Sequence, residues 1–182
     1  MRTFRNLVRR LAAAFEDVKL EYAFTGALAA SFYGVPRSTV DVDVIVRVSN
    51  KKDMDMLVSA LRNAGLKIDE KAINSVFKSG YRIFTIRDER TPYSVDIIIS
   101  EKRIGRRPGI IANVNTFFQK PEEVILAKLR MIKATIPKNR VIKDVEDIKG
   151  ILKFTRVDLR KVKVEAKKDK TLKVLEEILA EK

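Results

Sequence analysis

The chain has 182 residues, the length of one sizeable domain or of a domain with a small appendage, and its 46% hydrophobic and 34% charged residues exclude a disordered chain and a membrane protein. It contains neither Cys nor His, so thiol nucleophiles, zinc fingers and imidazole bases are excluded, and any acid–base or metal chemistry has to use carboxylates, Lys, Tyr or water. Its 38 Lys and Arg residues against 24 Asp and Glu residues give a net charge of +14, which favours a polyanionic partner.

Helical and strand-like segments alternate through the first two thirds of the chain. Apolar spacing and capping residues predict helices over residues 4–15, 27–33, 50–64 and 71–77. β-Branched runs predict strands over residues 21–25, 40–48, 81–87 and 93–100, followed by a basic loop over 103–109 and a short strand near Val114. This order predicts a mixed α/β core, a small mixed sheet with flanking helices, over residues 1–118.

The last third of the chain has helical periodicity. Pro121 and the acidic residues after it are typical of a first helical turn, and Pro137 is expected to end that helix. Further helices are predicted over 143–153 and 171–179, with a charge-rich, mobile linker over 160–170. We therefore expect a helical C-terminal part over residues 119–182 that packs on the core.

Two aspartates alternate with valines over residues 40–44. Side chains alternate across a strand, so Asp41 and Asp43 share one face, roughly 7 Å apart. Asp96 lies in a second apolar run and would complete a cluster of three carboxylates if the two strands are neighbours. Such hard oxygen ligands suit Mg²⁺ or Mn²⁺; the alternative is that these residues only solvate a strand end.

A glycine at a strand-to-helix turn precedes the two aspartates. Gly26 would let the backbone approach a phosphate, and the helix that follows would present free N–H groups to it. The spacing from Gly26 to Asp41 leaves room for one helix and a return into an adjacent strand. The phosphate-binding turn and the carboxylates would then meet at one end of the sheet.

The segment TGALAASFYGVPRSTVDVDVIV, which begins at Thr25, resembles the opening motif of the nucleotidyltransferase superfamily, the DNA polymerase β-like fold. Within it, the aromatic-Gly pair Tyr33-Gly34 and the run from Arg37 to Asp43 are similar to the minimal prokaryotic branch related to AbiEii-type toxins of type IV toxin–antitoxin systems. The segments 121–129 and 143–148 are similar to two helical motifs of that branch. One departure is Ala27, where the family usually has Ser or Gly, so a hydroxyl for the triphosphate is missing.

The resemblance implies a metal-dependent transfer of a nucleoside monophosphate from a nucleoside triphosphate to an acceptor hydroxyl. It implies Mg²⁺ or Mn²⁺ held by Asp41, Asp43 and Asp96, with Asp96 also aiding deprotonation of the acceptor. The implied nucleotide-binding residues are Thr25, Gly26, Ala27, Arg37 and Ser38.

Lys128 is the first candidate for a cation that neutralises the triphosphate, and an ordinary surface lysine is the alternative. Arg37 is the second candidate, and an ion pair with Asp41 or Asp43 is its structural alternative. Asp144 shares a helix face with Asp147 and is added as a catalytic candidate.

Basic segments over residues 2–10, 103–107 and 128–143 favour RNA, such as tRNA, or another polyanion as the acceptor. An antitoxin-like protein is a further candidate partner.

No segment approaches the ~18 apolar residues of a membrane span, so we expect a cytoplasmic protein. An inactive family member that binds nucleic acid or a protein partner is the alternative to an active enzyme, and an ion-rich thermophilic surface is the alternative to a polyanion-binding one.

Overall fold

The computed structural model describes residues 3–69, 71, 73, 75, 82–135 and 141–181. The chain divides into two compact units. The first, here called the sheet unit, consists of Met1–Leu28 and Ser38–Gln119. The second, here called the helical unit, consists of Ala29–Arg37 and Lys120–Lys182, so the short segment 29–37 belongs with the C-terminal helices.

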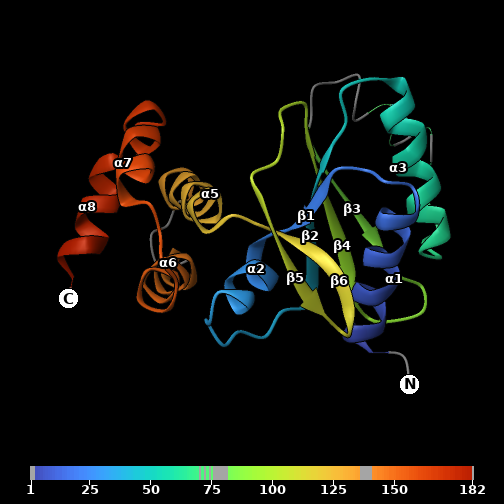
Figure 1. The fold of residues 1–182 in the computed structure, drawn as a ribbon, viewed down its shortest axis with the longest axis horizontal. Coiled ribbons are helices and arrows are strands. Elements are labelled where there is room, and N and C mark those ends of the chain that lie inside the picture. Colours follow the sequence, from blue (N-terminus) through green and yellow to red (C-terminus); the bar gives the residue numbers. More distant parts are fainter. Residues whose placement is uncertain are drawn as a thin grey trace. The chain divides into compact units, whose positions relative to one another are not determined.

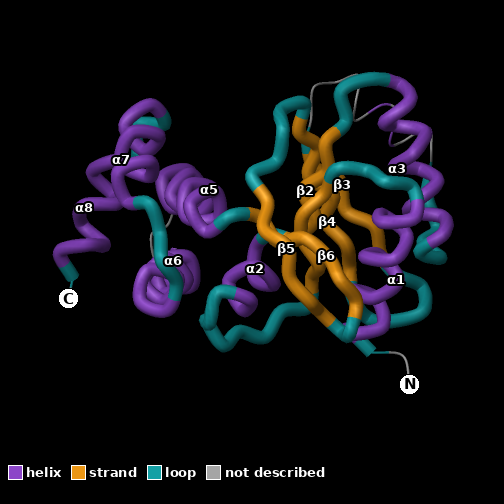
Figure 2. Tube along the Cα trace, in the orientation of Figure 1, coloured by secondary structure: helices purple, strands orange, loops and turns teal. Residues whose placement is uncertain are grey.

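The sheet unit contains a mixed sheet of six described strands in the order β3-β4-β2-β1-β6-β5 (Figures 1 and 2). The strands are β1 (Tyr22–Phe24), β2 (Asp41–Arg47), β3 (Ile83–Arg87), β4 (Ser94–Ser100), β5 (Arg106–Ile111) and β6 (Val114–Gln119). β2 runs parallel to β4, and β1 runs parallel to β6, while the other neighbouring pairs are antiparallel. The predicted mixed α/β fold is confirmed.

Much of the core of the sheet unit lies on one face of the sheet, although β1 is buried on both of its faces. The helices α1 (Phe4–Asp17) and α3 (Lys51–Asn63) lie on this side (Figure 1). Burial alternates along β2 and β4, because their valines and isoleucines at every second position face the core. The acidic positions between them therefore belong to the opposite, more open face.

The predicted basic loop over 103–109 is wrong from Arg106 onward, since these residues form β5. β5 and β6 make a hairpin in which Ile111 is opposite Val114, and the two residues between them, Ala112 and Asn113, have φ of 53° and 63°. Two residues at positive φ are what a tight hairpin turn requires. Pro108 is tolerated because β5 is an edge strand, whose outer N–H groups need no partner.

Four helices follow the sheet among the described residues of the helical unit. They are α5 (Pro121–Ala134), α6 (Ile142–Phe154), α7 (Leu159–Lys168) and α8 (Leu172–Ala180). The expected mobile linker over 160–170 is wrong, because α7 occupies most of it. Val162 and Ala166, one turn apart, are fully buried and anchor α7 within the unit, and the Asp158 carboxylate accepts a hydrogen bond from the Lys161 N–H at its start.

A short helix, α2 (Gly26–Phe32), begins in the sheet unit and continues into the helical unit. The helix expected over 71–77 and the helix end expected at Pro137 fall largely or wholly outside the described residues. Among the residues that are described, no helix is both long enough and apolar enough to cross a membrane.

Candidate active site

Asp43 and Asp96 lie side by side on neighbouring parallel strands. The register pairs Asp41 with Ser94 and Asp43 with Asp96. Because residues paired across a parallel ladder share a face, the carboxylates of β2 and β4 are on the same face of the sheet. Asp41, Asp43 and Asp96 are all partly exposed there, between valines and isoleucines that point into the core.

Hydroxyl groups orient two of these three carboxylates. The Ser94 hydroxyl donates a hydrogen bond to Oδ1 of Asp41, its partner in the register. Thr85, on the edge strand β3, is paired with Asp96 and donates from its hydroxyl to Asp96 Oδ1 at 2.5 Å. Neither hydroxyl was predicted from the sequence, because each contributes only through a strand pairing that sequence spacing does not reveal.

Gly26 lies directly against the Asp43 carboxyl group. Its φ of +57° is in the left-handed region, and an added Cβ would overlap Oδ2 of Asp43 and lie 2.7 Å from its Cγ. Only glycine gives this close approach. The backbone N–H of Thr25 donates to the Asp43 carbonyl oxygen at 3.0 Å, which joins the end of β1 to β2.

A polar row crosses the sheet at this level. The buried Thr25 donates from its hydroxyl to Gln119 Oε1 at 2.5 Å, at the end of β6. Gln119, Thr25, Asp43, Asp96 and Thr85 therefore follow one another across five strands, joined by hydrogen bonds or register pairs. This continuous row of polar side chains makes this line a chemically distinctive part of the sheet.

A cavity of about 380 Å³ adjoins Asp41 within the sheet unit. Asp41 and Ser94 form one wall, and Arg87 and Tyr93 contribute an exposed cation and an aromatic ring to the others. The cavity is large enough for part of a nucleotide or an acceptor group, and its wall is acidic only at Asp41 and Asp88.

The residue types at this face fit a hard divalent cation, since Asp41, Asp43 and Asp96 supply carboxylate oxygens and Gly26 leaves space beside one of them. As the described side chains stand, no three acidic groups converge closely enough to ligate one ion. These three residues would therefore hold a metal only with some rearrangement of their carboxylates, or together with oxygens from a bound substrate.

The other predicted nucleotide-binding residues are distributed over both units. Thr25, Gly26, Ala27 and Ser38 belong to the sheet unit, where Ala27 is buried and Ser38 exposed. Arg37 belongs to the helical unit.

Four charged residues form an ion-pair network inside the helical unit. The Lys128 ammonium lies 3.0 Å from Asp144 Oδ1 and 2.6 Å from Asp147 Oδ2, and its side chain is only 8% exposed. Arg37 forms its ion pair with Asp147. The alternative of an ordinary surface lysine is therefore wrong for Lys128, and the alternative pairing of Arg37 with Asp41 or Asp43 is wrong as well. The network joins α5, α6 and the segment 29–37. Asp147, which was not among the predicted site residues, pairs with both Lys128 and Arg37.

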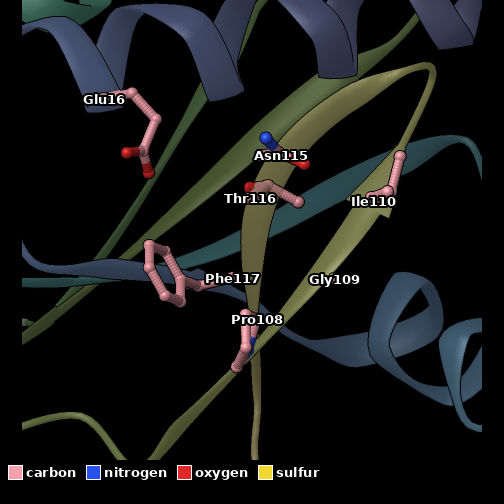
Figure 3. A pocket seen from close by; sticks show the side chains of 7 residues that line it. All are labelled: Glu16, Pro108, Gly109, Ile110, Asn115, Thr116 and Phe117. Atoms are coloured by element: carbon pink, nitrogen blue, oxygen red, sulfur yellow. The ribbon is translucent and has the colours of Figure 1, made fainter.

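A second cavity, of about 310 Å³, lies at the β5–β6 hairpin (Figure 3). Pro108, Gly109 and Phe117 contribute to its lining, and Glu16 reaches toward it from α1. It uses none of the strands that carry Asp41, Asp43 and Asp96. We assign it no part in the site.

The fold is that of nucleotidyltransferases. The solution structure of the antibiotic-resistance factor ANT(2'')-Ia matches with a TM-score of 0.64 and 14% identity, over 97% of this chain and 92% of that one. A crystal structure of ANT(2'')-Ia with adenylyl-2''-tobramycin gives a TM-score of 0.65 and 14% identity, over 92% and 97% of the two chains. An antigenic nucleotidyltransferase-like protein from Paracoccidioides brasiliensis matches with a TM-score of 0.53 and 13% identity, over 82% and 76%.

The family follows from the sequence match. Residues 6–182 match the family model described as nucleotidyl transferase AbiEii toxin, type IV toxin–antitoxin system. The chain therefore belongs to the AbiEii family of nucleotidyltransferase toxins, as the motifs indicated. Among curated proteins, none matches the chain.

Proposed function

We propose that this protein is a metal-dependent nucleotidyltransferase that moves a nucleoside monophosphate from a nucleoside triphosphate to an acceptor hydroxyl. The observation that carries the proposal is the register of β2 and β4, which sets Asp43 beside Asp96 and leaves Asp41 two residues away on the same face. Family membership supports nucleotidyl transfer in general. The close approach of Gly26 to Asp43 adds a place where a phosphate group would reach both backbone and carboxylate.

In this proposal the three aspartates divide the binding of metal between them. Asp41 and Asp43 would hold Mg²⁺ or Mn²⁺ together with the triphosphate, and with Asp96 they would hold a second ion near the acceptor hydroxyl; bound divalent cations supply charge stabilisation to the attacking and leaving oxygens. Asp96 takes the proton of the acceptor hydroxyl, whose oxygen then attacks the α-phosphorus. The bond from that phosphorus to the β-phosphate oxygen breaks, and pyrophosphate leaves.

Neighbouring groups prepare these carboxylates. Thr85 already occupies Oδ1 of Asp96, so the free oxygen Oδ2 is the one available to the acceptor proton. Gly26 and Ala27 offer backbone N–H groups near the start of α2, and Ser38 adds a hydroxyl. Thr25, whose N–H and hydroxyl donate to Asp43 and Gln119, would hold this turn in place; together these residues form the proposed nucleotide-binding segment. Because Ala27 has no hydroxyl, phosphate binding would depend more on the backbone.

Lys128, Arg37 and Asp144 are proposed to act on the nucleotide from the helical unit. Both cations are paired in the structure, Lys128 with Asp144 and Asp147 and Arg37 with Asp147. They would meet a triphosphate only after exchanging a carboxylate partner for a phosphate. This part of the proposal predicts that Lys128→Gln and Asp144→Asn lower transfer beyond any effect they have on folding.

The proposed acceptor is RNA, such as tRNA, and an antitoxin is a proposed protein partner. The charge of +14 supports a polyanionic acceptor, and the type IV toxin–antitoxin family supports an antitoxin. A second candidate function, binding without catalysis, is favoured by Ala27 and by the absence of three converging acidic groups among the described residues.

Transfer of labelled nucleotide from each of the four nucleoside triphosphates, with Mg²⁺ or Mn²⁺ and with total RNA as acceptor, tests the proposal. Asp43→Asn and Asp96→Asn should each lower incorporation by about 100-fold or more, as the loss of a transition-state contact does. The control Asp55→Asn changes an exposed aspartate on α3 and should leave it unchanged. Incorporation that survives Asp43→Asn would overturn the mechanism. No incorporation by the unaltered protein would favour the binding-only alternative.

A further inference from the structure

The segment around α7 carries cations that form no ion pair within the described part of the chain. Residues 156–173 contain eight Lys and Arg against three Asp and Glu. Two of the eight are paired, Lys161 with Glu123 and Lys168 with Glu165. The other six are exposed and have no ion pair with any described residue: Arg156, Arg160, Lys163, Lys167, Lys170 and Lys173.

The three acids of this segment are already used within the helical unit. Asp158 accepts from the backbone at the start of α7, Glu165 pairs with Lys168, and Asp169 pairs with Arg130 at 2.7 Å. The excess positive charge therefore faces solvent. An ion-rich thermophilic surface would instead pair its cations in networks, so this segment does not fit that alternative.

Three of the six unpaired cations line one face of α7. Arg160, Lys163 and Lys167 follow the i, i+3, i+7 spacing, which places them on the same side of a helix. They extend over about 10 Å at a rise of ~1.5 Å per residue. Val162 and Ala166, which anchor α7, are fully buried and lie on its other side.

We propose that this row, Arg160, Lys163 and Lys167, here called the α7 basic face, binds the phosphate backbone of a nucleic acid. Point charges on long, mobile side chains suit phosphates without selecting a base sequence. A membrane surface fits less well, because membrane-binding helices need a broad apolar face, whereas the exposed large apolar side chains on α7 are only Leu159 and Val164 among its described residues. The inference deepens the proposed function by locating a backbone-binding surface for an acceptor that carries phosphates.

Binding, rather than transfer, tests the inference, so its outcome does not depend on activity. The probe is a fluorescein-labelled single-stranded RNA 20-mer, with DNA of the same sequence as a second probe, and anisotropy is measured between 50 and 200 mM NaCl. Lys163→Gln/Lys167→Gln removes two charges from the α7 basic face. Lys51→Gln/Lys52→Gln removes two exposed charges from α3, which also have no ion pair with any residue that the structure describes, and is the matched control.

The α7 double variant should weaken RNA binding about fivefold or more at 50 mM NaCl and reduce the slope of log K against log salt by about 1.4, two phosphate contacts at ~0.7 each. The Lys51→Gln/Lys52→Gln control should change the RNA affinity and the salt slope by less than half as much as the α7 double variant does. DNA should respond as RNA does, because both carry the same phosphodiester backbone.

Three results would overturn the inference. Equal losses in both double variants would assign the effect to net charge alone. No salt-dependent binding by the unaltered protein would leave the α7 basic face without its ligand. Phosphatidylserine vesicles serve as a third probe. If the α7 double variant loses binding to these vesicles while its binding to RNA is unchanged, the α7 basic face is a membrane-binding surface. Loss of transfer with α7-dependent RNA binding intact would count against the catalytic proposal alone, and intact transfer without α7-dependent binding would count against this inference alone, so the two failures are separable.

Discussion

Replacing Gly26 with alanine should abolish nucleotidyl transfer while the protein stays folded. A residue with a side chain at φ of +57° costs about 1–2 kcal/mol in the left-handed region. The new Cβ would also overlap Oδ2 of Asp43 and lie 2.7 Å from its Cγ and 3.1 Å from its Cβ. Because the Asp43 side chain is only partly buried, it can turn away, so the clash displaces the carboxylate rather than unfolding the sheet.

The consequence for stability is small and the consequence for activity large. A loss of about 1–2 kcal/mol lowers Tm by roughly 2–8 °C in a chain of this size. Displacing one carboxylate should lower transfer by about 100-fold or more, as misplacing a catalytic group does. Urea unfolding measures the loss of stability, and incorporation of labelled nucleotide measures the loss of transfer activity.

Gly65→Ala is the matched control. Gly65 has φ of +74°, and the three atoms nearest to its added Cβ would belong to the guanidinium of Arg90, the far end of an exposed, flexible side chain. The free energy of unfolding of the Gly65→Ala protein should fall by about as much as that of Gly26→Ala, while its transfer activity stays within twofold of the unaltered protein. The reasoning is refuted if Gly26→Ala retains as much activity as Gly65→Ala, because Asp43 would then not need its place against Gly26.

Three further results follow from contacts within the sheet unit. Thr85→Val should lower transfer about tenfold or more by releasing Asp96, and Thr85→Ser, which keeps the hydroxyl, should restore most of it; equal losses would contradict the orienting role. Asp88→Ala should lower the free energy of unfolding by about 2–4 kcal/mol in urea, because it leaves Arg10 without its fully buried partner at 2.5 Å; a loss below ~0.5 kcal/mol would contradict this. Burial raises the pKa of the Tyr22 phenol, so the folded state favours the protonated form and this contribution to stability is lost as the pH rises above the ordinary value of about 10. Between pH 8 and pH 11 the unaltered protein should therefore lose more stability than Tyr22→Phe, and an equal loss would contradict it.

The strands that carry the site could be predicted because their pattern is local. Valine and aspartate alternate over 40–44, and burial in the structure alternates in the same way along β2. The run around Asp96 gave the same signal for β4. What the sequence could not supply is the register, which decides that Asp43 lies opposite Asp96 and brings Ser94 and Thr85 to the carboxylates.

The two wrong assignments have a common physical origin. In β5, basic residues together with Pro108 and Gly109 resemble a loop, and only its pairing with β6 makes it a strand. α7 consists mostly of charged residues, and its apolar stripe is narrow, so its sequence is similar to that of a linker. Val162 and Ala166 belong to that stripe and are buried within the helical unit. Tertiary contacts decide both elements, so their local composition was misleading.

The ion pairs of Lys128 and Arg37 illustrate a further limit. Sequence spacing correctly placed Asp144 and Asp147 on α6, but it could not show that they meet Lys128 from α5 and Arg37 from the segment before β2. The packing of the helices decides which residue a charged side chain pairs with, and the neighbouring residues along the chain do not.

A crystal structure with Mn²⁺ and a non-hydrolysable nucleoside triphosphate tests the central claim most directly. We expect an anomalous Mn²⁺ signal coordinated by carboxylate oxygens of Asp41 and Asp43, with Asp96 beside it and the α-phosphate facing all three. Nucleotide and Mn²⁺ bound elsewhere on the protein, with these aspartates untouched, would contradict it.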